Sequence, residues 1–326
     1  MTPLRFSSAS SVASGPFQWR LTPHADDGLR FKLHRSLMAS SSMLRLRGGP
    51  TAALWLRRVV GDYRHPVVAE ATPDVRVSFD GFDRYWMRFF FRGDSYEPEL
   101  YRLFTRMTRL RDLHFIDGGA NIGLWTAILT GSAFGVKRAV AVEASPTTFA
   151  ELARTAALCS DRFAAENVAL SAKPGTVMFE QGLKHESRRI AAASANPGAR
   201  NELVSVRATT IDDLVTKFDL SQRDLLVKLD VEGAEFDCFL GARDAFDAGA
   251  IFIYEDHGKD PTSELTRRLL AHGAVCWAIA DDGQLISLSD AAHASSLKMN
   301  PKRGYNFVAM SRERATTQSL ESRLFG

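Results

Sequence analysis

From residue 113 onward, short apolar runs alternate with longer stretches that have the hydrophobic spacing of amphipathic helices. We expect strands at 113–117, 138–143, 163–170, 175–180, 203–208, 224–230, 250–255, 274–280 and 305–310. Strands joined by helices predict a doubly wound, mostly parallel α/β sheet with helices on both faces. We assign this domain to residues 113–310.

Helix signals fall between these strands. Residues 121–133 are expected to form a helix, and further helices are expected after Glu232 and after Pro261. Ser145 followed by Pro146 predicts a helix start, because a serine oxygen can cap the first amides and proline has its φ preset for the first turn.

A small N-terminal module is expected over residues 66–112. The runs 75–79 and 84–91 alternate between apolar and polar residues well enough to predict two strands of a hairpin. From Glu97 an apolar stripe predicts an amphipathic helix. This module precedes the main domain, and residues 311–326 are expected to be a C-terminal tail.

The N-terminal 65 residues are rich in serine and arginine, and we expect a disordered tail. Residues 1–60 contain nine Lys or Arg and two acids, which gives this segment a charge of +7. Because the whole chain has a net charge of +3, residues 61–326 have a net charge of −4. Without a broadly basic body, nucleic acid is not an expected partner. The composition of the tail also resembles that of a mitochondrial transit peptide, and a third possibility is that the start codon was assigned too early. The expected location is cytoplasmic, with mitochondrial as the alternative.

The overall composition predicts a globular protein without a membrane span. The hydrophobic fraction is 45%, and no stretch reaches the ~18–20 uninterrupted apolar residues that cross a bilayer. Cys159, Cys238 and Cys276 are far apart without metal-ligand spacing, so we expect free thiols, with Cys238 and Cys276 buried.

Acidic residues close four of the expected strands: Asp117, Glu143, Asp230 and Glu255. In parallel α/β sheets, ligands bind outside the carboxyl ends of the strands, where the winding reverses. The spacing of these acids therefore predicts the site at that edge.

The run DGGANIG at 117–123 follows the first strand of the main domain. It is not a P-loop, because Leu124 and Trp125 stand where lysine and a hydroxyl residue are required, and no register fits Gly-x-Gly-x-x-Gly. It fits acid-x-Gly-x-Asn-x-Gly. Gly119 lets the backbone approach a ligand, the amides near Asn121 are expected to face a ligand carboxylate, and Asp117 attracts a cationic amino group.

Glu143 lies 24 residues beyond Gly119. A carboxylate at this strand end can accept both ribose hydroxyls of a nucleotide-type ligand. Asn167 and Val168 are candidates for contact with the adenine edge. Alternatively, the glycine run is only a turn and Glu143 only a surface acid; the order of the motifs favours a ligand site. The full set of expected ligand-contacting positions is Asp117, Gly119, Ala120, Asn121, Gly123, Glu143, Ala144, Ser145, Asn167, Val168 and Asp230.

Six segments together resemble the FkbM-type methyltransferases. They are RGDSYEPEL (92–100), FIDGGANIGLWT (115–126), AVEASPTTFAEL (141–152), ATTIDDL (208–214), LLVKLDVEGAEFDCFLGA (225–242) and IYEDHG (253–258). The resemblance covers about residues 75–310, and DVEGAE is its most specific part. It implies a seven-stranded, Rossmann-like class I methyltransferase fold with S-adenosylmethionine as donor. Gly118 departs from the usual aliphatic residue, and the first 60 residues have no counterpart in the family.

The resemblance implies O-methylation of a sugar, glycolipid or secondary metabolite. Methylation of an alcohol requires alignment and proton removal. His257 is the preferred base because imidazole titrates near neutral pH, and Asp230, Glu232 and Glu255 complete the expected catalytic group. Glu232 and Glu235 open the next helix, and for Glu235 in particular helix capping competes with a catalytic role. A magnesium ion held by Asp230, Glu255 and His257 is the alternative activator.

The acceptor is expected to be a small molecule or glycan. Candidate contacts are Tyr96 and Glu97 before the expected helix, and Lys184 and His185 in the polar segment 181–202. That segment is interpreted either as a solvated loop or as a lid over the substrate. The alternative functions are methylation of nitrogen or of a protein, and a non-catalytic module that binds a cofactor or partner.

Overall fold

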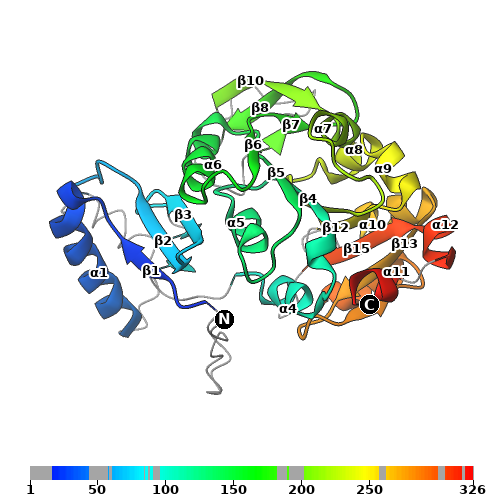
Figure 1. Ribbon diagram of the computed structural model, residues 1–326, viewed down its shortest axis with the longest axis horizontal. Coiled ribbons are helices and arrows are strands. Elements are labelled where there is room, and N and C mark those ends of the chain that lie inside the picture. Colours follow the sequence, from blue (N-terminus) through cyan, green and yellow to red (C-terminus); the bar gives the residue numbers. More distant parts are fainter. Residues whose placement is uncertain are drawn as a thin grey trace. The chain divides into compact units, whose positions relative to one another are not determined.

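The computed structural model describes residues 17–43, 58, 61–83, 85–86, 89–90, 96–181, 189–190, 202–256, 262–299, 305–317 and 320–325. It divides into two compact units, residues 1–98 and 99–326 (Figure 1). No helix among the described residues is both long and apolar enough to cross a bilayer.

The first unit contains a three-stranded antiparallel sheet and a helix. Its elements are β1 (Arg20–Thr22), η1 (Ala25–Asp27), α1 (Gly28–Met43), β2 (Val67–Thr72) and β3 (Val75–Phe79), with strand order β1-β2-β3. The carboxylate of Asp27 is fully buried and accepts hydrogen bonds from the amides of Arg64 and His65, both at 2.9 Å. This contact joins the start of α1 to the chain ahead of β2.

Two sequence expectations for this unit are corrected. The N-terminal segment expected to be a disordered tail contains β1 and α1, because buried groups such as Phe31 and Asp27 give it a core. Residues 85, 86, 89 and 90, expected in a strand, are helical, and β3 pairs with β2 instead. Among the described residues of this run, the rings of Trp86 and Phe90 pack against each other with centroids 5.9 Å apart and do not alternate across a sheet.

The second unit is built on an eight-stranded sheet with the order β14-β13-β15-β12-β11-β4-β5-β6. The strands are β4 (His114–Gly118), β5 (Arg138–Val142), β6 (Ala164–Glu166), β11 (Leu225–Leu229), β12 (Ile251–Glu255), β13 (Ala274–Ile279), β14 (Leu285–Ser287) and β15 (Asn306–Ser311). Neighbours from β6 to β12 are parallel, whereas β15 is antiparallel to β12 and β13. The doubly wound fold is thus confirmed. The expected seven strands become eight because β14 folds back on β13 after a turn at Gly283.

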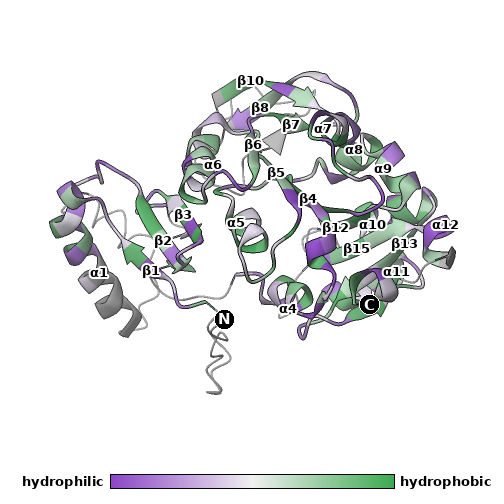
Figure 2. Cartoon of the chain, in the orientation of Figure 1, coloured by the Kyte–Doolittle hydropathy of each residue, from purple (hydrophilic) through white to green (hydrophobic). Residues whose placement is uncertain are grey.

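Helices flank the central strands on both sides (Figure 1). They are α4 (Pro98–Arg106), η2 (Leu110–Asp112), α5 (Leu124–Thr130), α6 (Pro146–Leu158), α7 (Ile211–Lys217), α8 (Glu235–Leu240), α9 (Arg243–Ala248), α10 (Glu264–Ala271), α11 (Ala291–Lys298), α12 (Arg312–Thr317) and α13 (Leu320–Leu324). Every residue of β4 and β11 is buried, so both faces of the sheet are covered. Hydrophobic residues accordingly dominate β13 and β15, whereas α12 is largely hydrophilic (Figure 2).

A smaller sheet has the order β7-β10-β8-β9, with β7 (Ala169–Leu170), β8 (Gly175–Gln181), β9 (Arg189–Ile190) and β10 (Glu202–Thr209). The single strand expected at 163–170 is therefore divided: β6 belongs to the central sheet and β7 to the second one. The break falls at 167–168. Residues Phe179, Val206 and Ala208 form the small core under this second sheet.

The C-terminal residues expected to be a tail contain α12 and α13. Leu320 and Leu324 are buried, and the guanidinium of Arg323 donates to the carbonyl oxygens of Gly249 and Arg223. These contacts fasten the end of the chain to the domain. Cys159, Cys238 and Cys276 are free and buried, as predicted for the latter two.

Candidate functional site

Four acids gather at the carboxyl edge of the central sheet. Asp117 lies in β4, Glu143 follows β5, Asp230 follows β11, and Glu255 ends β12; these strands are neighbours in the sheet. The chain winds outward from β4 through β5 to β6, and in the other direction from β11 to β12. The switch point lies between β4 and β11, where α/β folds bind ligands.

The loop after β4 has an unusual backbone. Gly119, Asn121 and Gly123 have φ values of +74°, +53° and +81°, respectively. A Cβ added to Gly119 would lie 1.8 Å from the carbonyl oxygen of Asp230. That oxygen cannot move away easily, since the Asp230 amide is bound to the Gly118 carbonyl at 3.0 Å. Gly119 is therefore required by both its conformation and its neighbour.

Asp117 is buried beneath this loop. The hydroxyl of Thr126 in α5 donates to its Oδ2 at 2.6 Å. Its Oδ1 is buried without a hydrogen-bond partner in the described part of the chain. Burial raises the pKa of Asp117, while Lys228 and the Thr126 hydroxyl oppose the rise. A buried carboxylate oxygen that lacks a donor marks a place where a ligand donor fits.

Lys228 is a charged residue that the sequence patterns did not single out. It lies opposite Asp117 in the parallel register of β11 and β4, and its side chain is 3% exposed. Its Nζ is 3.3 Å from Oδ2 of Asp230. One buried cation thus stands between two carboxylates and partly offsets their repulsion. The sequence feature that could have identified Lys228 is a lysine inside the apolar run LLVKL.

Glu143 binds two backbone amides. Its Oε2 accepts from Asn121 N at 3.0 Å and its Oε1 from Ser145 N at 2.8 Å. The amide of Asn121, expected to face a ligand carboxylate, is therefore directed at Glu143. A carboxylate oxygen can accept more than one hydrogen bond, so the two amide contacts do not by themselves exclude ligand hydroxyls.

The residues around Glu143 are fixed by side-chain contacts. Nδ2 of Asn167 donates to the carbonyl oxygens of Glu143 at 2.8 Å and Ala144 at 3.2 Å. Ser145 caps α6 by accepting from the Thr148 amide, which confirms the expected helix start. The side chain of Val168 is buried in the core under the sheet, so only its backbone is free of that core.

The segment DVEGAE forms a tight turn after β11. Glu232 and Gly233 have φ values of +53° and +100°. Oε1 of buried Glu235 accepts hydrogen bonds from the amides of Val231 and Gly233, each at 3.1 Å. The capping interpretation thus fits Glu235, and Glu232 occupies the strained position at the mouth of the turn.

Glu235→Ala is expected to lower the free energy of unfolding by about 1–3 kcal/mol, since two amides of a half-buried turn lose their acceptor. Urea denaturation measures the change. Asp237→Ala is the control, because Asp237 is exposed on the same helix. Equal stability of both variants would contradict the capping role of Glu235.

Glu255 and Asp256 at the end of β12 differ in burial. Asp256 is buried and bound to Nζ of Lys298 at 2.9 Å and to the Thr266 hydroxyl at 2.6 Å. This ion pair holds the strand end in place. Glu255 is half-buried and lies opposite Asn306 of β15. Buried Asn306 in turn donates to Glu99 of α4 at 3.0 Å, which attaches α4 to this edge.

His257, Tyr96, Glu97, Lys184 and His185 were also expected at the site. His257, Lys184 and His185 are outside the described residues. Tyr96 and Glu97 belong to the first unit, where Tyr96 contacts the rings of Tyr85, Trp86 and Phe89. Within the described ranges, Asp230 and Glu255 are not part of any cluster of three metal-ligating side chains, so the magnesium alternative gains no support.

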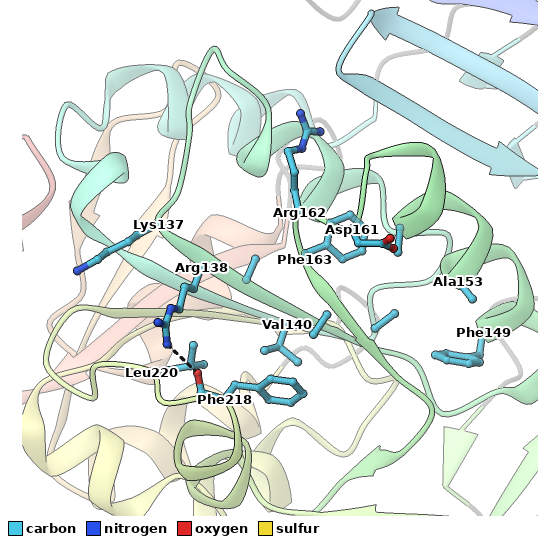
Figure 3. A pocket seen from close by; sticks show the side chains of 14 residues that line it. Lys137, Arg138, Val140, Phe149, Ala153, Asp161, Arg162, Phe163, Phe218 and Leu220 are labelled. Atoms are coloured by element: carbon cyan, nitrogen blue, oxygen red, sulfur yellow. Dashed lines mark hydrogen bonds between the residues drawn. The ribbon is translucent and has the colours of Figure 1, made fainter.

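A cavity of about 560 Å³ lies at the opposite end of β5 and β6 (Figure 3). Its walls combine Phe149, Phe163 and Phe218 with cationic side chains. Arg138 points to the carbonyl of Phe218, at 3.3 Å, and also pairs with Asp219. Because this cavity adjoins the amino ends of the strands, it is separate from the acids at the carboxyl edge.

Comparison with family models matches residues 117–276 to the model described as Methyltransferase FkbM domain. The match begins at Asp117 and includes the glycine loop, Glu143, the DVEGAE turn and β12. Comparison with curated protein sequences gave no match.

Among solved structures, a methyltransferase FkbM from Methylobacillus flagellatus KT is similar, with 15% identity and a TM-score of 0.40 over 69% of this chain. The chain spans 52% of that protein's length. A precorrin-6y C5,15-methyltransferase from Geobacter metallireducens GS-15 shares 11% identity over 66% of this chain and 88% of its own, with a TM-score of 0.34. P. horikoshii TYW2, solved in complex with MeSAdo, shares 14% sequence identity over 87% of this chain and 83% of its own, with a TM-score of 0.34.

Proposed function

We propose that the protein transfers a methyl group from S-adenosylmethionine to a hydroxyl of a sugar, glycolipid or secondary metabolite, because residues 117–276 match the model described as Methyltransferase FkbM domain. The observation that carries the cofactor assignment is the buried, unsatisfied oxygen of Asp117 beside a loop that only glycine can form at 119. The bound donor supplies an electrophilic methyl group.

The polar groups at the switch point fit the methionine end of this donor. Oδ1 of Asp117 lacks a donor, and an ammonium group supplies one. Asp230 follows the neighbouring strand β11, and its Oδ2 is 3.3 Å from Nζ of Lys228. Lys228 is a positioning residue in this proposal, since it binds Asp230 and its charge opposes the rise that burial causes in the pKa of Asp117.

Glu143 fits the ribose. Its oxygens are oriented by the amides of Asn121 and Ser145, so the carboxylate is held in one position before a ligand binds. Preorganised acceptors lose little entropy when they bind hydroxyls. Asn167 fixes the carbonyls of Glu143 and Ala144, and the backbone at 167–168 is assigned to the adenine edge.

The acceptor is assigned to the side of the site where β12 and α4 meet. Glu255, Glu232 and Asp230 line the strand ends there, and His257 follows two residues after Glu255. We assign His257 the role of general base, because a neutral imidazole accepts the proton that the acceptor hydroxyl loses. Tyr96, Glu97, Lys184 and His185 remain candidates for contacts with the acceptor.

The test is a methyl-transfer assay with labelled S-adenosylmethionine and pairs of sugars that carry a hydroxyl or an amino group at the same carbon. We expect labelled product from the hydroxyl member. His257→Ala is expected to lower the turnover number by about 100-fold, in the range typical of general bases, with unchanged affinity for S-adenosylhomocysteine.

His272→Ala is the matched control, since His272 is exposed in the same unit. Its turnover should equal that of the unmodified protein. Label transferred only to amino sugars or to protein would replace the O-methylation proposal. A folded protein that binds neither the donor nor S-adenosylhomocysteine would favour the non-catalytic module.

A further inference from the structure

Three potential metal ligands, none of which has been given a role above, cluster in the first unit. They are His24, Asp26 and His65, and one ligand atom from each lies within 4.8 Å of the others. Nδ1 of His24 is 3.5 Å and Nε2 of His65 is 3.8 Å from Oδ2 of Asp26. The two imidazole rings lie 3.9 Å apart between centroids.

The cluster joins two distant parts of the chain. His24 and Asp26 belong to the η1 turn, whereas His65 precedes β2. Buried Asp27, next to Asp26, accepts the amide of His65 at 2.9 Å and is bound by Arg30 at 2.9 Å. The Asp27 carboxylate therefore holds the backbones of both segments together and brings the three ligands into proximity.

The spacing is close to that of a coordinated ion. Tetrahedral zinc with bonds of about 2.0–2.1 Å places its ligand atoms roughly 3.3–3.4 Å apart. The observed 3.5 and 3.8 Å to Oδ2 of Asp26 need shifts of only a few tenths of an ångström, and the ligand atoms of His24 and His65 lie within 4.8 Å of each other. The Asp26 amide is 3.4 Å from Nδ1 of His24, which is a long and weak hydrogen bond.

We propose that His24, Asp26 and His65 bind a divalent transition-metal ion of the zinc class. Two imidazoles and one carboxylate are ligands that suit zinc, cobalt and nickel. The three side chains are 49%, 56% and 44% exposed, which leaves room for water on the remaining coordination positions. The ion cross-links the η1 turn to the chain ahead of β2 and so stabilises the first unit.

The experiment titrates the untagged, metal-free full chain with zinc chloride by calorimetry, and with cobalt chloride by absorption. We expect one equivalent to bind with micromolar affinity, and zinc to raise the melting temperature. His24→Gln, Asp26→Asn and His65→Gln should each weaken this site at least tenfold and remove the thermal shift. These side chains are exposed, so folding is expected to be retained.

His272→Gln is the matched control for histidines outside the cluster and should leave zinc binding unchanged. Zinc binding that is the same in the unmodified protein and in all three cluster variants would overturn the proposal. Absence of zinc and cobalt binding by the folded, metal-free protein would overturn it as well. Neither result bears on the cofactor assignment, whose residues lie in the second unit.

Discussion

Gly119→Ala is expected to abolish binding of S-adenosylmethionine, with a loss of at least 100-fold in affinity. The new Cβ would stand 1.8 Å from the Asp230 carbonyl oxygen, at a φ of +74°. To relieve the contact, either the loop after β4 or the turn after β11 must move, and both adjoin the proposed ligand. Calorimetric titration with S-adenosylhomocysteine measures the effect, and circular dichroism establishes that the sample is folded.

Gly273→Ala separates backbone strain from the steric clash. Gly273 has a φ of +85°, but nothing lies within 4 Å of an added Cβ. This variant should lose only about 1–2 kcal/mol of stability and keep its affinity. If Gly119→Ala binds the ligand as tightly as the unmodified protein does, the glycine loop is not part of the cofactor site.

Glu143→Ala should weaken binding of S-adenosylhomocysteine by at least tenfold, about 1.4 kcal/mol. Two causes act together: the ribose hydroxyls lose their acceptor, and the amides of Asn121 and Ser145 lose theirs. The same calorimetric titration measures the change. Unchanged affinity would move the ribose site elsewhere.

Glu143→Gln tests how the two causes combine. Glutamine keeps the size of the side chain and one oxygen acceptor, so one of the two backbone amides remains satisfied. We expect an affinity between those of the alanine variant and the unmodified protein. A glutamine variant that binds as weakly as the alanine variant would show that both carboxylate oxygens are required.

The main strands, and the sheet edge at which their terminal acids gather, could be predicted from local patterns. Runs such as 225–229 are too short and too apolar for an exposed helix, and an acid after each run marks its carboxyl end. The glycine loop and the capped start of α6 are likewise encoded within a few residues. For that reason the amino-acid pattern alone places Asp117, Gly119 and Glu143 at one edge of the sheet.

The structure of the N-terminal unit could not be predicted from local patterns. The pattern of residues 84–91 alternates like a strand, but Trp86 and Phe90 pack against each other, and the described residues 85, 86, 89 and 90 are helical. Asp27 is buried because amides from residues 64 and 65 satisfy it, and no local pattern encodes a partner 37 or 38 positions away.

The sequence by itself determined the α/β class, the positions of the main strands and the identity of the acids at their ends, because these depend on periodicity and turn chemistry over a few residues. Only the tertiary structure decided what those groups contact. Lys228 became part of the site through its register with Asp117, and Glu143 was found to hold two amides. His24, Asp26 and His65 were brought together by chain segments 39 residues or more apart. Such contacts depend on strand order and long-range packing, which no single stretch of sequence contains.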